Sequence, residues 1–358
     1  MTSLGSLLQG SLLVRVEADA KGGTGHAMRC LALAQAWQDA GGGPVRFLMT
    51  RCGTGLSERL RREGIVGEIL EAVPGTESDA ARTLERAHAG HASWVVVDGY
   101  WAGAAYVKSL RATPGRGPAI LAVDDLGEAG PYAADLVLNQ NLYAEPEMYA
   151  DRSPHTELLL GADFALLRRE FAAYRGFPRT IPEEARHILV TLGGSDPANR
   201  TQLVLRALRG LAASREIRVL IGPENPREDS LRAEAAAAGL AGSLLTGVED
   251  VPGLLAWSDL AVTAAGSTCW ELAFLGVPAL TIAVADNQRP IAESLSNAGV
   301  ARDLGWHEDV DESAVARAVA ELSGDRAARA RMAEAGRRLV DGRGAERVVR
   351  RLATAKAA

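Results

Sequence analysis

The stretch "GGTGHAMRC", residues 22–30, places a histidine directly after closely spaced glycines. Its glycines, among them Gly23 and Gly25, permit a tight turn that a ligand can approach closely. Apolar residues then recur at helical spacing, so His26 is expected in the first turn of a helix, where the helix dipole disfavours protonation of an imidazole. A neutral imidazole can accept a proton near neutral pH, which indicates a general base. A histidine that only caps or packs is the alternative.

The glycines of this turn do not follow the spacing of a dinucleotide-binding fingerprint, and no acidic residue follows at the expected place. A nicotinamide cofactor is therefore not expected, and no other cofactor is indicated. The sequence also contains no G-x-S-x-G elbow, P-loop or metalloprotease helix.

A second glycine turn, "TLGGSDPANRT", lies at residues 191–201. Gly194 frees the backbone, and Ser195 could cap the following helix or bind a phosphate, because the N–H groups at a helix start attract anions. An ordinary Ser-Asp-Pro helix cap is the alternative interpretation.

A third turn, in "TAAGSTCWELAFLGVPAL" (residues 263–280), has the strongest phosphate-binding pattern. A strand leads through Gly266, Ser267 and Thr268 into a helix start, which is typical of a diphosphate site. Glu271, one turn further on, could accept hydrogen bonds from a ribose diol. A Ser/Thr-x-x-Glu capping box would explain the same residues. Two amides at another strand end, in "ADNQRP", join this candidate site: Asn287 and Gln288.

Polar side chains also end the strands of the first half of the chain. "VVVDGYW" supplies Asp98 and Tyr100, and "AVDDLGE" supplies two further aspartates. Paired carboxylates can hold a metal, but no third ligand follows at a suitable spacing, so no metal site is expected. "LNQNLYA" contributes Asn141, a possible hydrogen-bond partner for a sugar.

Runs of Val, Ile and Leu alternate with helical patterns throughout, which is typical of parallel sheets covered on both faces. The pattern restarts after a polar, proline-containing stretch, and this indicates two doubly wound domains in tandem. We expect an N-terminal Rossmann-like domain over 1–165, a linker over 166–186, a C-terminal Rossmann-like domain over 187–340 and a helical tail over 341–358. The tail is expected to pack, except for its final "ATAKAA". The expected strands are 12–18, 45–50, 93–100, 119–126, 134–141, 187–194, 217–222, 243–247, 259–266 and 279–286. The expected helices include 26–40, 55–63, 79–89, 199–213, 229–238, 268–275 and 290–298.

The 358 residues carry a net charge of −6 and no basic stripe, which argues against nucleic-acid binding. Three widely spaced cysteines fit neither a disulfide framework nor a metal motif, so reduced thiols and a cytoplasmic location are expected. No stretch is long and apolar enough to span a membrane, and the start lacks the features of a signal peptide. A monomer is the default expectation.

Seven of these runs together resemble a known family. "GTGHAMRCLALA", "DGYW", "AVDDLGE", "LNQNLYA", "LLGADFALLRREF", "VTLGGSDPANRT" and "AGSTCWELAFLGVP…DNQ" are similar, in order and spacing, to the nucleotide-sugar hydrolase of the pseudaminic acid pathway. Spore-coat polysaccharide proteins and the B-type glycosyltransferase of peptidoglycan synthesis are relatives of that enzyme. The resemblance covers residues 14 to 300 and implies two Rossmann-like domains facing across a cleft.

The resemblance also implies an activity: removal of UDP, without metal, from UDP-2,4-diacetamido-2,4,6-trideoxy-β-L-altropyranose. It implies that His26 is the catalytic base and that Asp98 and Tyr100 lie near the anomeric carbon. The expected substrate-binding residues are Gly23, Gly25, Arg29, Asn141, Gly194, Ser195, Gly266, Ser267, Thr268, Glu271, Asn287 and Gln288. Two alternatives stay open: a glycosyltransferase that uses the same UDP site and an acceptor hydroxyl, and a sugar-nucleotide binding protein without turnover.

Overall fold

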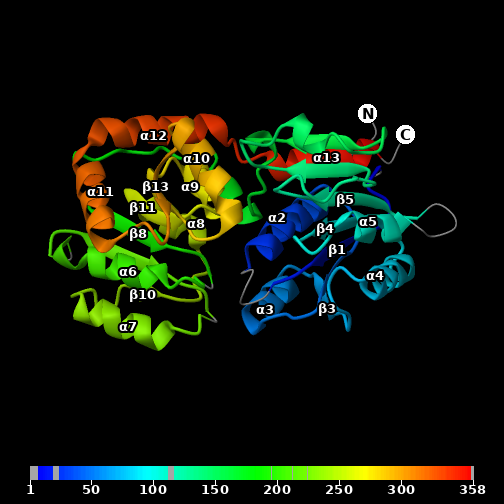
Figure 1. Ribbon diagram of the computed structural model, residues 1–358, viewed down its shortest axis with the longest axis horizontal. Coiled ribbons are helices and arrows are strands. Elements are labelled where there is room, and N and C mark those ends of the chain that lie inside the picture. Colours follow the sequence, from blue (N-terminus) through cyan, green and yellow to red (C-terminus); the bar gives the residue numbers. More distant parts are fainter. Residues whose placement is uncertain are drawn as a thin grey trace. The chain divides into compact units, whose positions relative to one another are not determined.

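The computed structural model describes residues 7–18, 24–111, 117–194, 196–211, 213–223 and 225–355. It divides the chain into two compact units (Figure 1). The first unit consists of Met1–Arg169 together with Arg343–Ala358, and the second consists of Glu170–Gly342. Each unit is an α/β domain built on its own parallel sheet.

The first unit contains a seven-stranded parallel sheet of order β3-β2-β1-β4-β5-β6-β7. Its strands are β1 (Ser11–Val16), β2 (Val45–Met49), β3 (Val66–Ile69), β4 (Ala92–Asp98), β5 (Ala119–Val123), β6 (Leu136–Asn139) and β7 (Glu157–Leu160). Its helices are α2 (Gly25–Asp39), α3 (Thr54–Arg62), α4 (Glu77–Ala89), α5 (Ala104–Arg111) and α13 (Gly344–Ala355), with the short 3-10 helices η1 (Pro146–Tyr149) and η2 (Ala162–Phe164).

Side chains of β1 alternate between two cores, as the two-residue period of a strand requires. Leu12 and Val14 belong to a core that includes residues of α2 and α13. Leu13 points to the opposite face, where its core includes residues of α4 and α5. The central strands are apolar on both faces because helices cover both, as the near-continuous Val, Ile and Leu runs predict.

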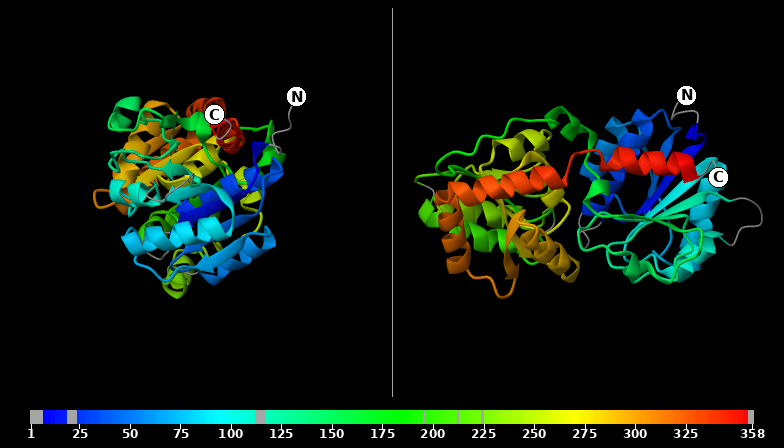
Figure 2. Two further views of the ribbon diagram at one scale, coloured as in Figure 1. Left: turned by 90° about the vertical axis from the view of Figure 1, so that its right-hand side faces the viewer. Right: turned by 90° about the horizontal axis from the view of Figure 1, so that it is seen from above.

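The last helix, α13, belongs to the first unit, although the whole second unit precedes it in the chain. Figure 2 shows it in red along that unit, where Val348 and Leu352 are fully buried in the core that contains α2. The expectation that "ATAKAA" stays unpacked is wrong at Ala353, which is 1% exposed in the same core. The residues expected as a linker, 166–186, divide between the two units and include the buried Phe171 in η3 (Arg169–Tyr174).

The second unit contains a six-stranded parallel sheet of order β10-β9-β8-β11-β12-β13. Its strands are β8 (His187–Thr191), β9 (Glu216–Leu220), β10 (Leu244–Leu245), β11 (Leu260–Ala264), β12 (Ala279–Ala283) and β13 (Ala301–Trp306). Its helices are α6 (Arg200–Ala207), α7 (Glu228–Ala237), α8 (Val251–Trp257), α9 (Thr268–Leu275), α10 (Arg289–Asn297), α11 (Glu312–Gly324) and α12 (Arg326–Leu339), with η4 (Arg209–Leu211) and η5 (Asp286–Gln288).

Local capping chemistry sets several helix starts. Asp311 accepts a hydrogen bond from the N–H of Ala314 at the start of α11, and Asp325 accepts one from Ala328 at the start of α12. A capping side chain satisfies a helix N–H that has no partner within the helix. These aspartates therefore fix where the last helices of the second unit begin.

All ten expected strands are present, and both sheets have the strand order of a doubly wound fold. Three strands, β3, β7 and β13, were not expected. In β3, Val66 and Ile69 are more than half exposed, so this edge strand lacks the apolar run that marks a buried one. Two short helices, α5 and α8, were also not expected. No described helix is long and apolar enough to cross a membrane.

Candidate active site

The candidate site of the first unit lies where its strand order reverses. β1 pairs with β2 on one side and β4 on the other, and the chain leaves β1 toward α2. Ligands of open parallel sheets bind outside the carboxyl ends of the strands at such a point. His26 lies in the first turn of α2, and Asp98 is the last residue of β4. The fold therefore brings these two predicted residues to the same edge.

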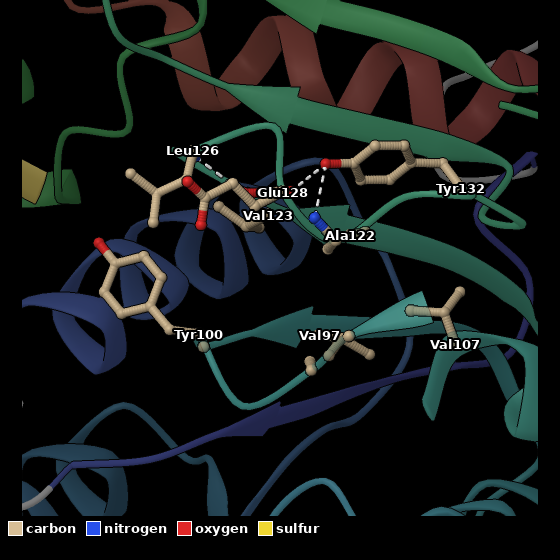
Figure 3. Close-up of a pocket in the computed structure, with 13 residues that line it drawn as sticks. Val97, Tyr100, Val107, Ala122, Val123, Leu126, Glu128 and Tyr132 are labelled. Carbon is tan, nitrogen blue, oxygen red and sulfur yellow. Dashed lines mark hydrogen bonds between the residues drawn. The ribbon is translucent and has the colours of Figure 1, made fainter. Parts of the chain in front are cut away.

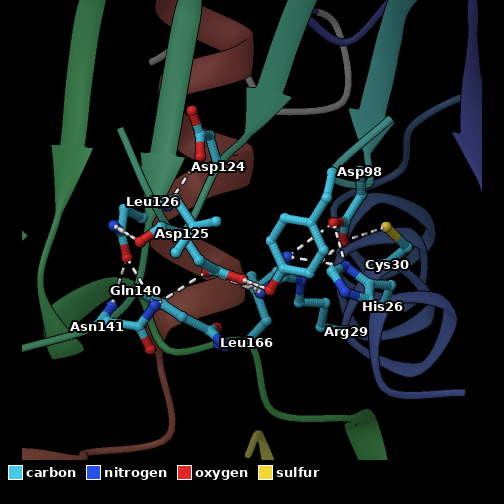
Figure 4. A network of polar contacts seen from close by, with 12 residues as sticks. His26, Arg29, Cys30, Asp98, Asp124, Asp125, Leu126, Gln140, Asn141 and Leu166 are labelled. Atoms are coloured by element: carbon cyan, nitrogen blue, oxygen red, sulfur yellow. Dashed lines mark hydrogen bonds and ion pairs between the residues drawn. The ribbon is translucent and has the colours of Figure 1, made fainter. Parts of the chain in front are cut away.

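His26 and Asp98 form a direct pair (Figure 4). His26 Nδ1 lies 2.6 Å from Asp98 Oδ1, and the two side chains are 17% and 0% exposed. An ionised carboxylate can only accept, so Nδ1 carries the proton that Asp98 accepts. In the neutral ring the other nitrogen, Nε2, holds a lone pair, and none of the described residues hydrogen-bonds to it. This is the tautomer that a general base requires.

Arg29, one helical turn after His26, holds Asp98 in place. Its Nε donates to Asp98 Oδ2 at 2.7 Å, and one terminal nitrogen donates to Oδ1 at 2.7 Å. The other terminal nitrogen donates to both oxygens of Asp125, at 2.9 and 2.8 Å. One guanidinium thus joins two carboxylates, a use for which its planar fork of donors is suited.

Asp125 follows β5 and connects Arg29 to other polar residues at the same edge of the sheet. Its Oδ1 accepts from the amide of Asn141 at 3.0 Å, and its backbone oxygen accepts from the hydroxyl of Tyr143 at 2.7 Å. The hydroxyl of Tyr100 donates to Oδ2 at 3.3 Å. Asp125 is 4% exposed, so the carboxylate is buried among its donors.

Tyr100 is the exposed member of the cluster. The residue is 51% exposed, and its ring meets the His26 ring edge to face with the centroids 5.1 Å apart. Burial around the hydroxyl and the Asp125 carboxylate raise the pKa of Tyr100, so its phenol stays protonated. Tyr100 therefore lies against His26 with a protonated hydroxyl that donates to Asp125.

The charges of the cluster stabilise one another. Burial alone would raise the pKa of Asp98, but the Arg29 guanidinium and His26 hold it well below its usual range. Burial likewise opposes the charge of Arg29, yet Asp125 and Asp98 raise its pKa further. Burial and the Asp98 carboxylate raise the pKa of Cys30, whose thiol lies 3.3 Å from Asp98 Oδ2. Asp98 and Arg29 are therefore charged, and Cys30 is a neutral thiol.

The structure changes the expected roles of three residues. Asp98 is fully buried and its oxygens are occupied, so it could act on a ligand only through His26, as a positioning residue. Arg29 and Asn141, expected to bind substrate, are 8% and 2% exposed and direct their donors to carboxylates. Sequence reasoning gave no role to Tyr143, although it lies within the quoted run "LNQNLYA".

In the second unit, the turn after β8 does not offer a free helix start. The carboxylate of Asp196 accepts from the backbone N–H groups of Arg200 and Thr201, at 2.9 and 2.8 Å. Asp196 is 2% exposed and therefore occupies the start of α6, where an anion was expected to bind. The aspartate cap is thus the correct interpretation for α6. Gly194, just before it, accepts from the N–H of Gly222 at 3.1 Å.

The turn after β11 differs, because the residue at the cap position of α9 makes no side-chain capping hydrogen bond. That residue is Ser267, so a capping box led by Ser267 does not form. A Cβ at Gly266 would meet only Gln288 Nε2, at 4.0 Å. β11 lies between β8 and β12, which places Gly194, Gly266 and Gln288 after three adjacent strands. The backbone N–H groups of Cys269 and Trp270 donate to the carbonyl oxygens of Gly266 and Ser267, at 3.0 and 3.1 Å, so an anion at this edge would meet the N–H groups of Ser267 and Thr268.

The remaining predicted residues fall into two groups. Gly25, Thr268, Glu271 and Asn287 are all partly exposed at element starts or first turns. Gly23 and Ser195 lie outside the described residues. Among the residues that the structure describes, no group of three or more His, Cys, Asp or Glu side chains could hold a metal ion.

Residues 187–347 match the model of the glycosyltransferase family 28 C-terminal domain. The spore coat polysaccharide biosynthesis protein SpsG of Bacillus subtilis is 27% identical over 60% of this chain and 63% of its own length. A UDP-N-acetylglucosamine–N-acetylmuramyl-(pentapeptide) pyrophosphoryl-undecaprenol N-acetylglucosamine transferase of Halorhodospira halophila is 38% identical over 43% of this chain and 44% of its own length. The chain therefore spans less than two thirds of the length of these relatives.

Solved structures extend the similarity to the fold of nearly the whole chain. MnaA of S. aureus, in a structure with UDP, superposes with a TM-score of 0.65 over 95% of each chain, at 16% identity. At that identity the likeness concerns the fold, which has two Rossmann-like parallel-sheet domains and is the B-type glycosyltransferase fold. The second half of this chain thus matches the glycosyltransferase family 28 C-terminal domain, within a fold shared by nucleotide-sugar enzymes.

Proposed function

We propose that the protein is a glycosyltransferase that moves a sugar from UDP to an acceptor hydroxyl, with His26 as the general base. The observation that carries this proposal is the 2.6 Å contact between His26 Nδ1 and Asp98. It orients the imidazole and leaves Nε2 as the proton acceptor, at a residue that is partly exposed at the switch point of the sheet.

In the proposed step, His26 Nε2 takes the proton of the acceptor hydroxyl while its oxygen bonds to the anomeric carbon. The bond between that carbon and the phosphate oxygen breaks, and UDP leaves with the electron pair. The Asp98 carboxylate stabilises the imidazolium that forms, as the buried carboxylate does in a Ser-His-Asp triad. Arg29 keeps Asp98 ionised and in place, and general-base assistance of this kind contributes roughly 10²–10⁴ in rate.

The proposal assigns UDP to the turns of the second unit. The start of α9, whose cap residue makes no side-chain capping hydrogen bond, supports this assignment, because backbone N–H groups and the helix dipole attract a diphosphate. Gly266, Ser267 and Thr268 would contact the phosphates, with Gly194 beside them. Ser195, which lies outside the described residues, stays a predicted contact from sequence. Glu271 would accept from the ribose hydroxyls, and Asn287 and Gln288 would complete the site. Gly25 would border the sugar in the first unit.

Transfer is proposed in preference to hydrolysis. The same base could deprotonate water, and release of UDP from a UDP-linked diacetamido-trideoxy sugar was the first expectation from sequence. The Halorhodospira relative, however, is named as a transferase that uses UDP-N-acetylglucosamine, and the matched family is one of glycosyltransferases. These names favour an acceptor hydroxyl over water.

The test measures UDP release from a panel of UDP-sugars, with and without candidate acceptors that carry free hydroxyls. UDP release that depends on an acceptor, with a glycosylated product, supports transfer. Prompt release of UDP and free sugar without acceptor would instead establish hydrolysis. UDP binding that is tight but never followed by cleavage would leave a sugar-nucleotide binding protein.

A further inference from the structure

A second buried polar cluster lies on the face of the first sheet opposite to the one that α2 covers. Arg15 of β1 is 0% exposed, and the two-residue period of the strand places it on the same side as Leu13, whose core includes residues of α4 and α5. Its Nε and one terminal nitrogen donate to the two oxygens of Asp79 in α4, at 2.9 and 3.0 Å. The other terminal nitrogen lies 2.5 Å from Glu17. The proposed catalytic step uses none of these charged groups.

Trp101, in the turn between β4 and α5, packs onto this cluster. Its ring lies against the Arg15 guanidinium, with Cζ 4.3 Å from the ring centroid, and meets the Tyr106 ring edge to face at 5.1 Å. A Cβ at Gly99 would lie 2.2 Å from Trp101 Nε1, and a Cβ at Gly75 would lie 2.5 Å from the Trp101 backbone oxygen. The two glycines therefore let the backbone approach Trp101 closely, and the residue is held from several sides.

The indole N–H of Trp101 is buried, and none of the described residues accepts a hydrogen bond from it. An unpaired buried donor is costly. Trp101 therefore contributes through its ring, which offers an aromatic face to the buried guanidinium of Arg15. Phenylalanine would offer such a face without the unpaired N–H.

Tyr100, the residue before Trp101, is held much less firmly. It is 51% exposed, its ring lies 5.1 Å from the His26 ring, and its hydroxyl donates to Asp125 at 3.3 Å. It also borders a pocket of about 200 Å³ whose other walls include Val97 of the α4 and α5 core (Figure 3). Because the Tyr100 ring has space beside it, its own packing restrains it weakly, and its position depends on the turn that carries it.

We propose that Trp101 is a positioning residue that keeps Tyr100 against His26. Arg15 and Tyr106 fix the Trp101 ring on one face of the sheet, and the anchored turn directs the preceding side chain toward the imidazole. Tyr100 in turn restrains rotation of the His26 ring, so that Nε2 faces the acceptor hydroxyl. This inference rests on the proposed function and adds to it a residue that acts through Tyr100 and is not itself catalytic.

The test measures kcat and KM for UDP release from the UDP-sugar that the intact protein turns over. Trp101→Leu removes the aromatic face from Arg15 and should lower kcat about 10–100-fold, the effect of a small displacement next to a reacting group. The affinity for UDP should not change, because the proposed nucleotide-binding turns lie in the other unit. Trp101→Phe keeps an aromatic face and should restore most of kcat. Thermal unfolding checks folding, and Trp101→Met replaces Trp101→Leu if the latter does not fold.

The same substitution in a Tyr100→Ala background shows whether Trp101 acts through Tyr100. Tyr100→Ala alone should lower kcat, and Trp101→Leu should then lower it no further, because residues that act as one unit are not additive. Trp257→Leu in the second unit is the matched control, since the Trp257 ring also lies against an arginine, with Cζ of Arg218 3.9 Å from the ring centroid. This control should keep the kcat of the intact protein.

Three results would overturn the inference: an unchanged kcat in Trp101→Leu, an unchanged kcat in Tyr100→Ala, or a Trp101→Leu effect of equal size in both backgrounds. If His26→Ala loses activity while Trp101→Leu keeps it, this inference fails and the proposed function stands. An intact protein that releases UDP from no UDP-sugar, with or without acceptor, would overturn both.

Discussion

The Nδ1 atom of His26 lies 2.6 Å from Oδ1 of Asp98, although 72 positions separate the two residues in the chain. Arg29 donates a hydrogen bond to each oxygen of the same carboxylate, so Asp98 lies between the His26 imidazole and the buried Arg29 guanidinium. The proton-accepting atom of the proposed base is thus oriented by a charge that is itself held in place. Most of our predictions test this relationship.

Replacement of His26 by alanine should lower kcat roughly 10²–10⁴-fold, because the acceptor hydroxyl then loses its base. The affinity for UDP should change little, since the proposed nucleotide-binding turns lie in the other unit. Steady-state kinetics and UDP titration measure the two effects. His88→Ala is the matched control, as His88 is exposed in the last turn of α4. A His26→Ala variant with nearly intact kcat would remove this residue from the mechanism.

Asp98→Asn should lower kcat by roughly 10²–10⁴-fold with KM almost unchanged. An amide in this position can donate to Nδ1, which favours the tautomer whose Nε2 carries a proton and cannot act as a base. The pH dependence of kcat separates this effect from simple misfolding. If the variant keeps both the rate and the pH profile of the intact protein, Asp98 does not position His26.

The same substitution should change how stability depends on pH. The pKa of Asp98 in the folded protein lies below its value in the unfolded chain, so its ionised form stabilises the fold. That contribution is complete above the unfolded pKa of about 3.9 and decreases as the pH falls toward the folded pKa. In urea unfolding, the free energy of unfolding of the intact protein should therefore exceed that of Asp98→Asn near pH 7, and this difference should decrease below pH ~4. A difference that stays constant over this pH range would contradict a lowered pKa of Asp98 in the folded protein.

Asp196→Ala should reduce the free energy of unfolding by about 0.5–2 kcal/mol, because two N–H groups of α6 lose their acceptor. Asp196 also has a φ of +39°, a conformation that asparagine tolerates better than alanine. Asp196→Asn should therefore lose less stability, since it keeps one acceptor oxygen. Equal losses for both variants in denaturant titrations would show that the cap is not the cause.

Gly266→Val should weaken UDP binding about tenfold or more, which corresponds to about 1.4 kcal/mol. Among the described residues a Cβ at Gly266 would meet only Gln288 Nε2, at 4.0 Å, so a side chain there extends into the space at the start of α9. Thermal unfolding checks that the variant folds. Gly210→Val in the second unit is the matched control, since a Cβ at Gly210 would meet no heavy atom within 4 Å. Unchanged UDP affinity in a folded Gly266→Val protein would place the diphosphate elsewhere.

Much of the fold could be predicted from sequence because its central strands are apolar runs. "SWVVVDGY" predicts a buried strand and is one, as β4. β13, "ARDLGW", was not predicted because only Ala301 of its six residues is buried, and an edge strand of this kind lacks a hydrophobic pattern. The helix expected over 199–213 is longer than α6, which ends at Ala207 and is followed by the 3-10 helix η4.

The site could be predicted only in part. The rule that ligands bind at the carboxyl ends of parallel strands brought His26, Asp98 and Tyr100 to one edge. This rule could not predict that the Arg29 guanidinium donates its hydrogen bonds to two carboxylates. Those hydrogen bonds depend on the relative positions of α2, β4 and the loop after β5. Nor could the rule decide whether a bound phosphate or the Asp196 carboxylate occupies the start of α6, because the sequence of this turn is compatible with both.

The position of α13 has a consequence for how the protein is made. The apolar side of α2 that packs with Val348 and Leu352 stays uncovered while the ribosome synthesises all of residues 170–342. The first unit is therefore synthesised first but completed last, because its core is covered only when α13 has been synthesised. Nascent chains that stop before residue 344 should expose that surface to chaperones, whereas the second unit would already have its entire sequence.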